Sequence, residues 1–136
     1  MTGCVVPPEP IPDADSAPFW DALREGILLY QRCANCGHAQ LYFRAMCKTC
    51  WSRALEVVPA SGLGTVYSFT IVHQAGHAGL AADVPYTLGL VDLDEGPRLL
   101  ARLAPEAGAI GARVRAATFA AGASSLLRFD PEEPAR

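Results

Sequence analysis

The pattern of apolar and polar positions begins with an extended arm and one short helix. Residues 1–15 carry four prolines and no apolar periodicity, which is typical of an extended arm. Ser16 is a favourable first residue for a helix, and the next apolar side chains form one stripe: Phe19, Trp20, Leu23 and Ile27. Gly26 is a natural stop, so the sequence predicts a helix within residues 16–26. A helix this short is marginal in water, so its stripe must pack either on this chain or on a partner.

Strand patterns follow the middle of the chain, and we assign them to residues 56–136. Alternating or apolar runs predict five short strands: Thr65–Val72, Tyr86–Leu93, Leu99–Leu103, Val114–Phe119 and Leu126–Phe129. The turn at residues 94–97 (Asp-Glu-Gly-Pro) joins the second and third strands as a hairpin. Gly62 and Gly64 bracket the start of the first strand, where a bulge or bend is expected. Five short strands without a long helical pattern predict a small closed barrel.

Residues 27–55 contain the most specific motif in the chain. Four cysteines form the pattern C-x2-C-x10-C-x2-C: Cys33, Cys36, Cys47 and Cys50. Two close pairs of thiolates are typical of a tetrahedral Cys4 zinc site, which leaves no open position for water and is therefore structural. Four reduced core cysteines and a rubredoxin-like iron site are the alternatives. Short strands are expected at Leu28–Arg32 and Gln40–Phe43.

The zinc segment is also basic. It carries Arg32, Arg44, Lys48 and Arg53, and no carboxylate precedes Glu56. Two interpretations remain open at this point. The cations neutralise a Cys4 zinc site of net charge −2, or they form a surface that binds an anion.

Composition excludes several classes of protein. The chain has 136 residues, of which 51% are hydrophobic and 18% charged, as in a small globular protein. Its net charge of −3 argues against a general nucleic-acid or membrane-surface binder. No apolar run is long enough to cross a bilayer, and residues 1–15 do not resemble a secretory signal. We therefore expect a cytoplasmic protein.

Candidate catalytic residues are few. Cys4 stands apart in the arm, and His73 and His77 lie in a glycine-rich loop between two predicted strands without a third ligand of suitable spacing. Asp92 and Asp94 face the same side of a strand, where a solvated hairpin end is the simplest interpretation. We predict no catalytic residue and no independent enzyme activity. The loop from His73 to Pro85 is long for a barrel connection, which indicates a functional edge or a mobile connector.

The order of these elements resembles one known family. The matching stretches are Phe19–Gly26, Gln31–Gly37, Gly62–Thr70, Asp83–Tyr86 and Leu93–Leu100. In this order they are similar to the acyl-CoA-associated zinc-ribbon/OB-fold proteins, formerly a domain of unknown function. The resemblance implies a mainly β protein with a short N-terminal helix, a rubredoxin-like Cys4 zinc ribbon and a C-terminal OB-fold barrel.

The resemblance also implies a function. Members of the family are non-catalytic companions of thiolase-like enzymes, bind that partner, and help to form the path of the acyl-CoA. It implies a heterotetramer with two copies of each subunit, and a CoA thioester as ligand of the complex. Arg44 and Arg53 are the candidate contacts for the CoA phosphates.

The competing function is binding of single-stranded nucleic acid. OB barrels bind single strands through stacked aromatic side chains and a basic groove. Tyr67 and Phe69 are spaced for such a platform, but they equally well fill the barrel, and the chain has a single lysine. The acidic balance favours the companion of a CoA enzyme over this alternative.

Overall fold

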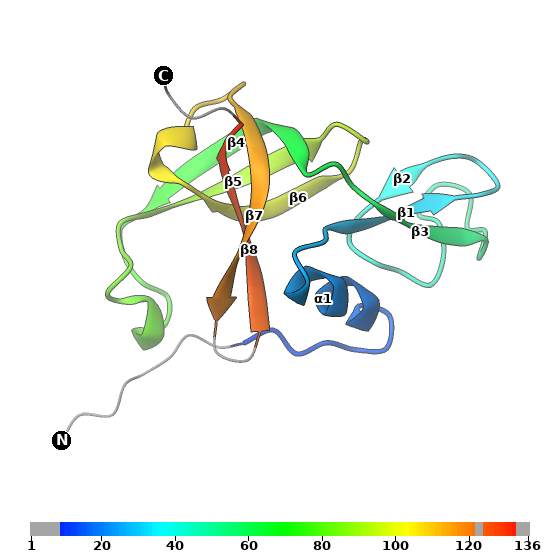
Figure 1. Ribbon diagram of the computed structural model, residues 1–136, viewed down its shortest axis with the longest axis horizontal. Coiled ribbons are helices and arrows are strands. Elements are labelled where there is room, and N and C mark those ends of the chain that lie inside the picture. Colours follow the sequence, from blue (N-terminus) through cyan, green and yellow to red (C-terminus); the bar gives the residue numbers. More distant parts are fainter. Residues whose placement is uncertain (1–8, 122–123, 133–136) are drawn as a thin grey trace.

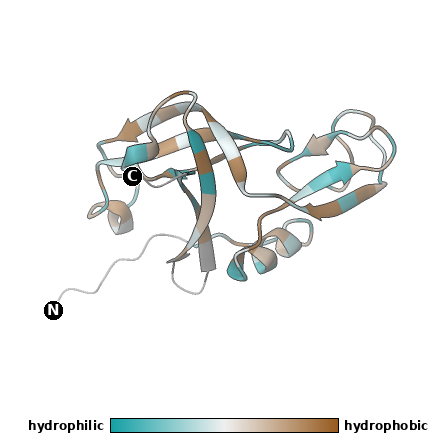
Figure 2. Cartoon of the chain, turned by 45° about the horizontal axis from the view of Figure 1, so that its top comes forward, coloured by the Kyte–Doolittle hydropathy of each residue, from teal (hydrophilic) through white to brown (hydrophobic). Residues whose placement is uncertain are grey.

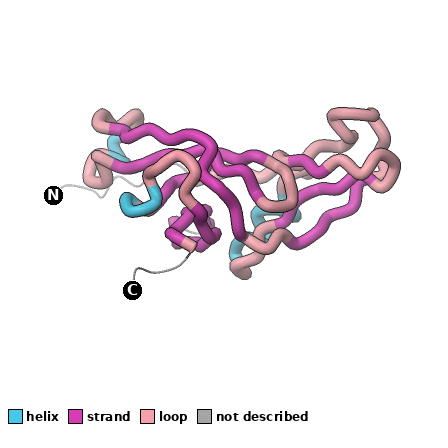
Figure 3. Tube along the Cα trace, turned by 90° about the horizontal axis from the view of Figure 1, so that it is seen from above, coloured by secondary structure: helices cyan, strands magenta, loops and turns pink. Residues whose placement is uncertain are grey.

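The computed structural model describes residues 9–121 and 124–132. A small sheet with the cysteine knuckles lies at one end of an elongated molecule and a barrel at the other, with an α-helix beneath their junction (Figure 1). Cys4 and the rest of residues 1–8 lie outside the described residues. Figure 3 shows the same two-part arrangement from above, with strands in magenta.

Helix α1 (Ala17–Arg24) forms where the sequence predicts it. Ser16 occupies the N-cap position, but its side chain accepts a hydrogen bond from the Asp13 backbone instead of capping the helix. The helix ends before Gly26, whose φ of 80° turns the chain away. Phe19 and Leu23 are buried, and α1 contacts β1 and β8, so the helix packs on its own chain. Ile27, expected on the same stripe, is 42% exposed because it follows that turn.

The small sheet has three antiparallel strands in the order β2-β1-β3. They are β1 (Leu29–Cys33), β2 (Ala39–Gln40) and β3 (Leu55–Pro59). β2 is shorter than predicted because the chain leaves the sheet at Tyr42, which bonds to the barrel. β3 pairs with β1 along its whole length, from Leu29 opposite Pro59 to Cys33 opposite Leu55, so the sheet extends beyond residue 55.

The predicted barrel is confirmed as a closed barrel with the order β4-β5-β6-β8-β7. Its strands are β4 (Leu63–Val72), β5 (Tyr86–Leu93), β6 (Arg98–Leu103), β7 (Arg113–Ala121) and β8 (Ser124–Pro131). β4 and β7 close it in antiparallel pairing, and β6 and β8 are parallel. Its interior contains Val66, Val91, Val114 and Phe129, each at most 1% exposed. Figure 2 shows hydrophobic residues (brown) along the barrel strands.

The first barrel strand contains a β-bulge that the sequence pattern placed elsewhere. Register shifts between Val66 and Ser68, beyond the predicted position at Gly62 and Gly64. Tyr67 is the extra residue, and it is 51% exposed, whereas Phe69 packs against the core. Of the two interpretations of these aromatic side chains, filling of the barrel holds for Phe69 and not for Tyr67.

Candidate metal centre and apolar pocket

The four cysteines converge on one point. Their Sγ atoms all lie within 4.8 Å of one another, with Cys33 and Cys50 3.5 Å apart and Cys36 and Cys47 3.6 Å apart. Zn–S bonds of about 2.3 Å in a tetrahedron require sulfurs about 3.8 Å apart. The donor set and its spacing therefore fit a structural zinc ion, held by four thiolates with no open coordination position.

Hydrogen-bond donors point at these sulfurs. The backbone N–H of Cys36 donates to the Cys33 sulfur and that of Thr49 to the Cys47 sulfur, both at 3.4 Å. The side-chain amide of Asn35 lies 3.5 Å from the Cys50 sulfur. Together with the backbone of Ser52 and the neighbouring cysteines, it lowers the pKa of that thiol to about 6. Such donors stabilise thiolates, which is the form that binds metal.

Two buried glutamines hold the second knuckle in place. Gln31 and Gln40 bond to each other at 2.9 Å and are 6% and 1% exposed. Gln31 binds both the N–H and the carbonyl of Arg44, and Gln40 accepts from the N–H of Lys48 at 3.0 Å. These contacts satisfy the backbone of a loop that has no regular structure. The sequence analysis missed both residues, because polar side chains in a strand pattern read as solvent-facing.

The predicted CoA contacts lie in the segment between β2 and β3. Arg44 and Arg53 are both exposed, and neither forms a salt bridge within the described residues. The structure does not bring them together with His73 and His77, which lie in the loop between β4 and β5. His77 Nδ1 accepts a hydrogen bond from the N–H of Gly79 at 2.9 Å, so it caps a short 3-10 helix, η1 (Ala78–Leu80).

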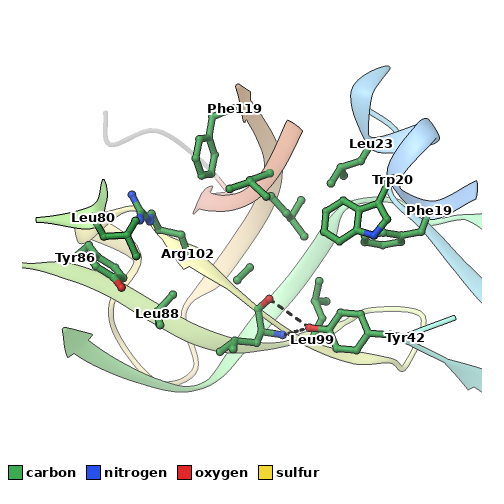
Figure 4. Close-up of a pocket in the computed structure, with 14 residues that line it drawn as sticks. Phe19, Trp20, Leu23, Tyr42, Leu80, Tyr86, Leu88, Leu99, Arg102 and Phe119 are labelled. Atoms are coloured by element: carbon green, nitrogen blue, oxygen red, sulfur yellow. Dashed lines mark hydrogen bonds between the residues drawn. The ribbon is translucent and has the colours of Figure 1, made fainter. Parts of the chain in front are cut away.

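A mostly apolar pocket of about 360 Å³ lies between α1 and the barrel (Figure 4). Its walls come from separate parts of the chain: Trp20 from the helix, Tyr42 from the segment between β2 and β3, Leu80 from η1, and Leu88 and Leu99 from the barrel. Among the described residues that line it, Arg102 is the one with a charged side chain. Its guanidinium is 3.3 Å from Asp83 and 4.4 Å from the centre of the Tyr86 ring.

Other barrel arginines are engaged with carboxylates. Arg98 pairs with Asp92 at 2.6 Å and lies 3.4 Å from the centre of the Tyr67 ring. Arg113 pairs with Asp94 at 2.7 Å, which holds the pKa of Asp94 below its ordinary value. Asp92 and Asp94 thus have separate cationic partners and do not form an acid–base pair.

A four-cysteine ribbon, an apolar helix and a closed five-stranded barrel define a two-part zinc-ribbon/OB-fold protein. Residues 20–56 match the family model described as the rubredoxin-like zinc ribbon domain of ChsH2, and residues 57–119 match its C-terminal OB-fold domain. A DUF35 domain-containing scaffold protein from Methanocaldococcus jannaschii is 31% identical over 102 residues, covering 71% of this chain and 72% of that protein. The chain belongs to the DUF35 family.

Two further proteins are similar to this chain. The solved structure described as the Ltp2-ChsH2(DUF35) aldolase matches with a TM-score of 0.80 and 32% identity, over 92% of this chain and 100% of that one. The benzoylsuccinyl-CoA thiolase subunit BbsA of Geobacter metallireducens is 46% identical over 76 residues, 55% of this chain.

Coverage of the relatives is partial. The chain spans 49% of the length of the BbsA subunit. It spans 30% of a probable enoyl-CoA hydratase alpha subunit from Thermomonospora curvata, which is 36% identical over 96 residues. Of the described helices, none combines the length and the apolar character that crossing a bilayer requires.

Proposed function

We propose that this chain is a non-catalytic accessory subunit of a thiolase-like enzyme or an aldolase that acts on acyl-CoA thioesters. The observation that carries the proposal is the match to the Ltp2-ChsH2(DUF35) aldolase over the whole of that chain. The similarity to a subunit of a benzoylsuccinyl-CoA thiolase supports it, because thiolases and aldolases both make or break carbon–carbon bonds. The complex is cytoplasmic and contains two copies of each subunit.

The side chains of the barrel support a role without chemistry of its own. A nucleophile needs a base within hydrogen-bond reach and a third group that orients the base. In the described part of the chain, the cysteines are gathered in the metal centre. His77 is bonded to its own loop, and Asp92 and Asp94 are bonded to arginines.

The apolar pocket is the proposed wall of the acyl-CoA path. It is large enough for an acyl group, and its mostly apolar lining excludes water from a thioester that passes beside it. Leu80 brings the loop from His73 to Pro85 into the wall, so this loop is the edge that faces the enzyme. Arg44 and Arg53, both exposed on the ribbon, are the proposed contacts for the CoA phosphates.

The barrel surface supports this function over binding of a nucleic-acid strand. A stacking platform needs a free aromatic face beside unpaired cations. One face of Tyr67 is covered by Arg98, and Arg98 and Arg113 are each paired with carboxylates. We therefore propose that the barrel has no nucleic-acid partner.

Co-expression with the thiolase-like or aldolase protein encoded next to this chain tests the proposal. We expect the two chains to co-purify, and light scattering to give two copies of each. The isolated chain is expected to turn over no acyl-CoA. Failure to co-purify contradicts the proposal, as does hydrolysis or thiolysis by the chain alone that is lost on substitution of one of its own residues.

A further inference from the structure

The two metal-binding knuckles share a backbone turn but differ in the residue that follows the second cysteine. Gly37 follows Cys36 with φ of 79°, and Trp51 follows Cys50 with φ of 65°. Each N–H closes its turn onto the carbonyl of the first cysteine, at 2.8 Å for Gly37 and 2.9 Å for Trp51. A positive φ suits glycine, whereas a bulky side chain is strained there. The second knuckle thus has tryptophan where the backbone favours glycine.

The Trp51 side chain does not offset this strain by packing. It is 75% exposed, and it forms no ring contact with another aromatic side chain in the described residues. Met46, 41% exposed, lies with it around a hollow of about 380 Å³. An exposed large aromatic residue on a strained backbone disfavours folding in two ways, through the strain and through the apolar surface left in water. Such a combination is typical of binding sites.

The charge around Trp51 indicates what binds. Arg44 and Lys48 line the same hollow, Arg53 follows Trp51 by two residues, and residues 27–55 contain no carboxylate. The three cations are exposed and carry no salt bridge within the described residues. An apolar centre with a cationic rim is complementary to an acidic surface that has an apolar centre.

We propose that Trp51 and Met46, with Arg44, Lys48 and Arg53 around them, form the surface that docks an acidic, partly apolar patch of the enzyme subunit. We call it the knuckle surface. The proposal rests on the proposed function, which supplies the enzyme subunit. Trp51 and Met46 fill the desolvated centre of the interface, and Lys48 pairs with a carboxylate of the partner, while Arg44 and Arg53 at the rim stay available for the CoA phosphates. The zinc ion would act here by fixing the turn that presents Trp51.

Substitution W51G separates binding from folding. Glycine relieves the backbone strain, so zinc content and thermal stability are expected to stay equal to wild type or rise. The Kd for the enzyme subunit, measured without CoA, is expected to rise at least tenfold. Ile110→Gly is the matched control, because Ile110 is 72% exposed in a barrel loop outside the knuckle surface. It is expected to leave the Kd unchanged.

The charges are tested on the same complex. Lys48→Glu is expected to raise the Kd by a larger factor at low salt than at high salt, because salt screens the charge pairing between the two surfaces. Omitting CoA assigns this effect to the enzyme subunit and not to the CoA phosphates. Should W51G lose zinc, Lys48→Glu and Met46→Ser leave the strained residue in place and report on the same surface.

The outcomes of these measurements are distinct. If the wild-type chain binds the enzyme subunit and the Kd of W51G lies within twofold of the wild-type Kd, the knuckle surface is overturned. The proposed function then still stands. If W51G lacks zinc, an unchanged Kd for both Lys48→Glu and Met46→Ser overturns the knuckle surface. A wild-type chain that binds no thiolase-like or aldolase partner overturns the proposed function itself.

Discussion

The phenol oxygen of Tyr42 lies 2.9 Å from the backbone nitrogen of Leu100, although 58 residues separate them in the sequence. Tyr42 belongs to the ribbon and Leu100 to β6 of the barrel, so this hydrogen bond joins the two parts beside the apolar pocket (Figure 4). Because its backbone partner lies in a barrel strand, the bond limits how far the ribbon turns relative to the barrel.

Removing this hydroxyl tests the joint. Tyr42→Phe is expected to lower the free energy of unfolding by about 1 kcal/mol, the usual net value of one hydrogen bond. Urea unfolding measures it. Tyr86→Phe is the control, because it removes a hydroxyl that forms no hydrogen bond within the described residues. It is expected to lower the free energy of unfolding by less. Equal effects of the two substitutions would show that the Tyr42 bond does not stabilise the joint.

Zinc binding is expected to depend on every cysteine of the cluster. Cys36→Ser removes one thiolate, and zinc content is expected to fall from one ion per chain to less than half. Metal binding to such sites is worth on the order of 10 kcal/mol, so the ribbon is expected to unfold. Elemental analysis and circular dichroism check this. Cys4→Ser, outside the four-cysteine pattern, is the control, and iron in place of zinc in the wild type would contradict the prediction.

Glycine is needed where two barrel strands meet closely. A Cβ atom at Gly64 would lie 2.7 Å from the Asp92 carbonyl oxygen and 2.8 Å from a methyl of Val91. Gly64→Ala is therefore expected to destabilise the barrel by about 1–3 kcal/mol, the range found for overpacking. Gly76→Ala is the matched control, since a Cβ there meets nothing within 4 Å. A Gly64→Ala variant as stable as wild type would mean that β4 and β5 can move apart to admit the methyl group without lowering the free energy of unfolding.

The ion pair between Asp94 and Arg113 predicts a pH dependence. The hydrogen bond from Arg113 lowers the pKa of Asp94 in the folded chain below its unfolded value of about 3.9. Its contribution to stability is therefore present above pH 4 and lost as the pH falls through the lowered pKa. Asp94→Asn is expected to lower the urea midpoint at pH 7, and its difference from wild type is expected to shrink as the pH falls through the lowered pKa. Asp21→Asn, in an exposed pair 3.7 Å from Arg24, is the control for the loss of a surface carboxylate at pH 7.

The loop from β4 to β5 is expected to matter for the activity of the complex. Replacing Ala75–Ala81 by a short Gly-Ser link removes Leu80 from the pocket wall. The acyl-CoA activity of the complex is expected to fall while zinc content stays the same. Leu80→Ser is expected to have part of this effect, and Ala78→Ser, in the same turn but outside the pocket wall, is the control. An intact complex with unchanged activity would make the loop a simple connector.

Regular patterns account for the parts of the structure that the sequence predicts correctly. The barrel strands alternate or run apolar, and the turn at residues 94–97 leaves little choice for the pairing of β5 with β6. The metal centre is equally predictable from the sequence, because two Cys-x-x-Cys pairs within 18 residues are typical of a metal site and of little else.

The features that the sequence did not predict depend on contacts between distant segments. Tyr67 leaves the barrel because an extra residue enters β4, and nothing in an alternating run marks that position. β3 reads as a barrel strand by composition but pairs with β1 in the ribbon. The sequence gives no sign that Gln40 is buried, because its partner, the backbone N–H of Lys48, reaches it only in the folded chain.

The packing of α1 sets the order in which the chain becomes complete during synthesis. Helix α1 packs against β8, the last of the described strands. The burial of Phe19 and Leu23 is therefore complete only after more than 100 further residues have been made. At about 5–20 residues per second, that delay is about 5–20 s. The ribbon does not wait in this way, since all its strands precede residue 60. A nascent chain is therefore expected to hold its metal while the helix still exposes an apolar face to chaperones.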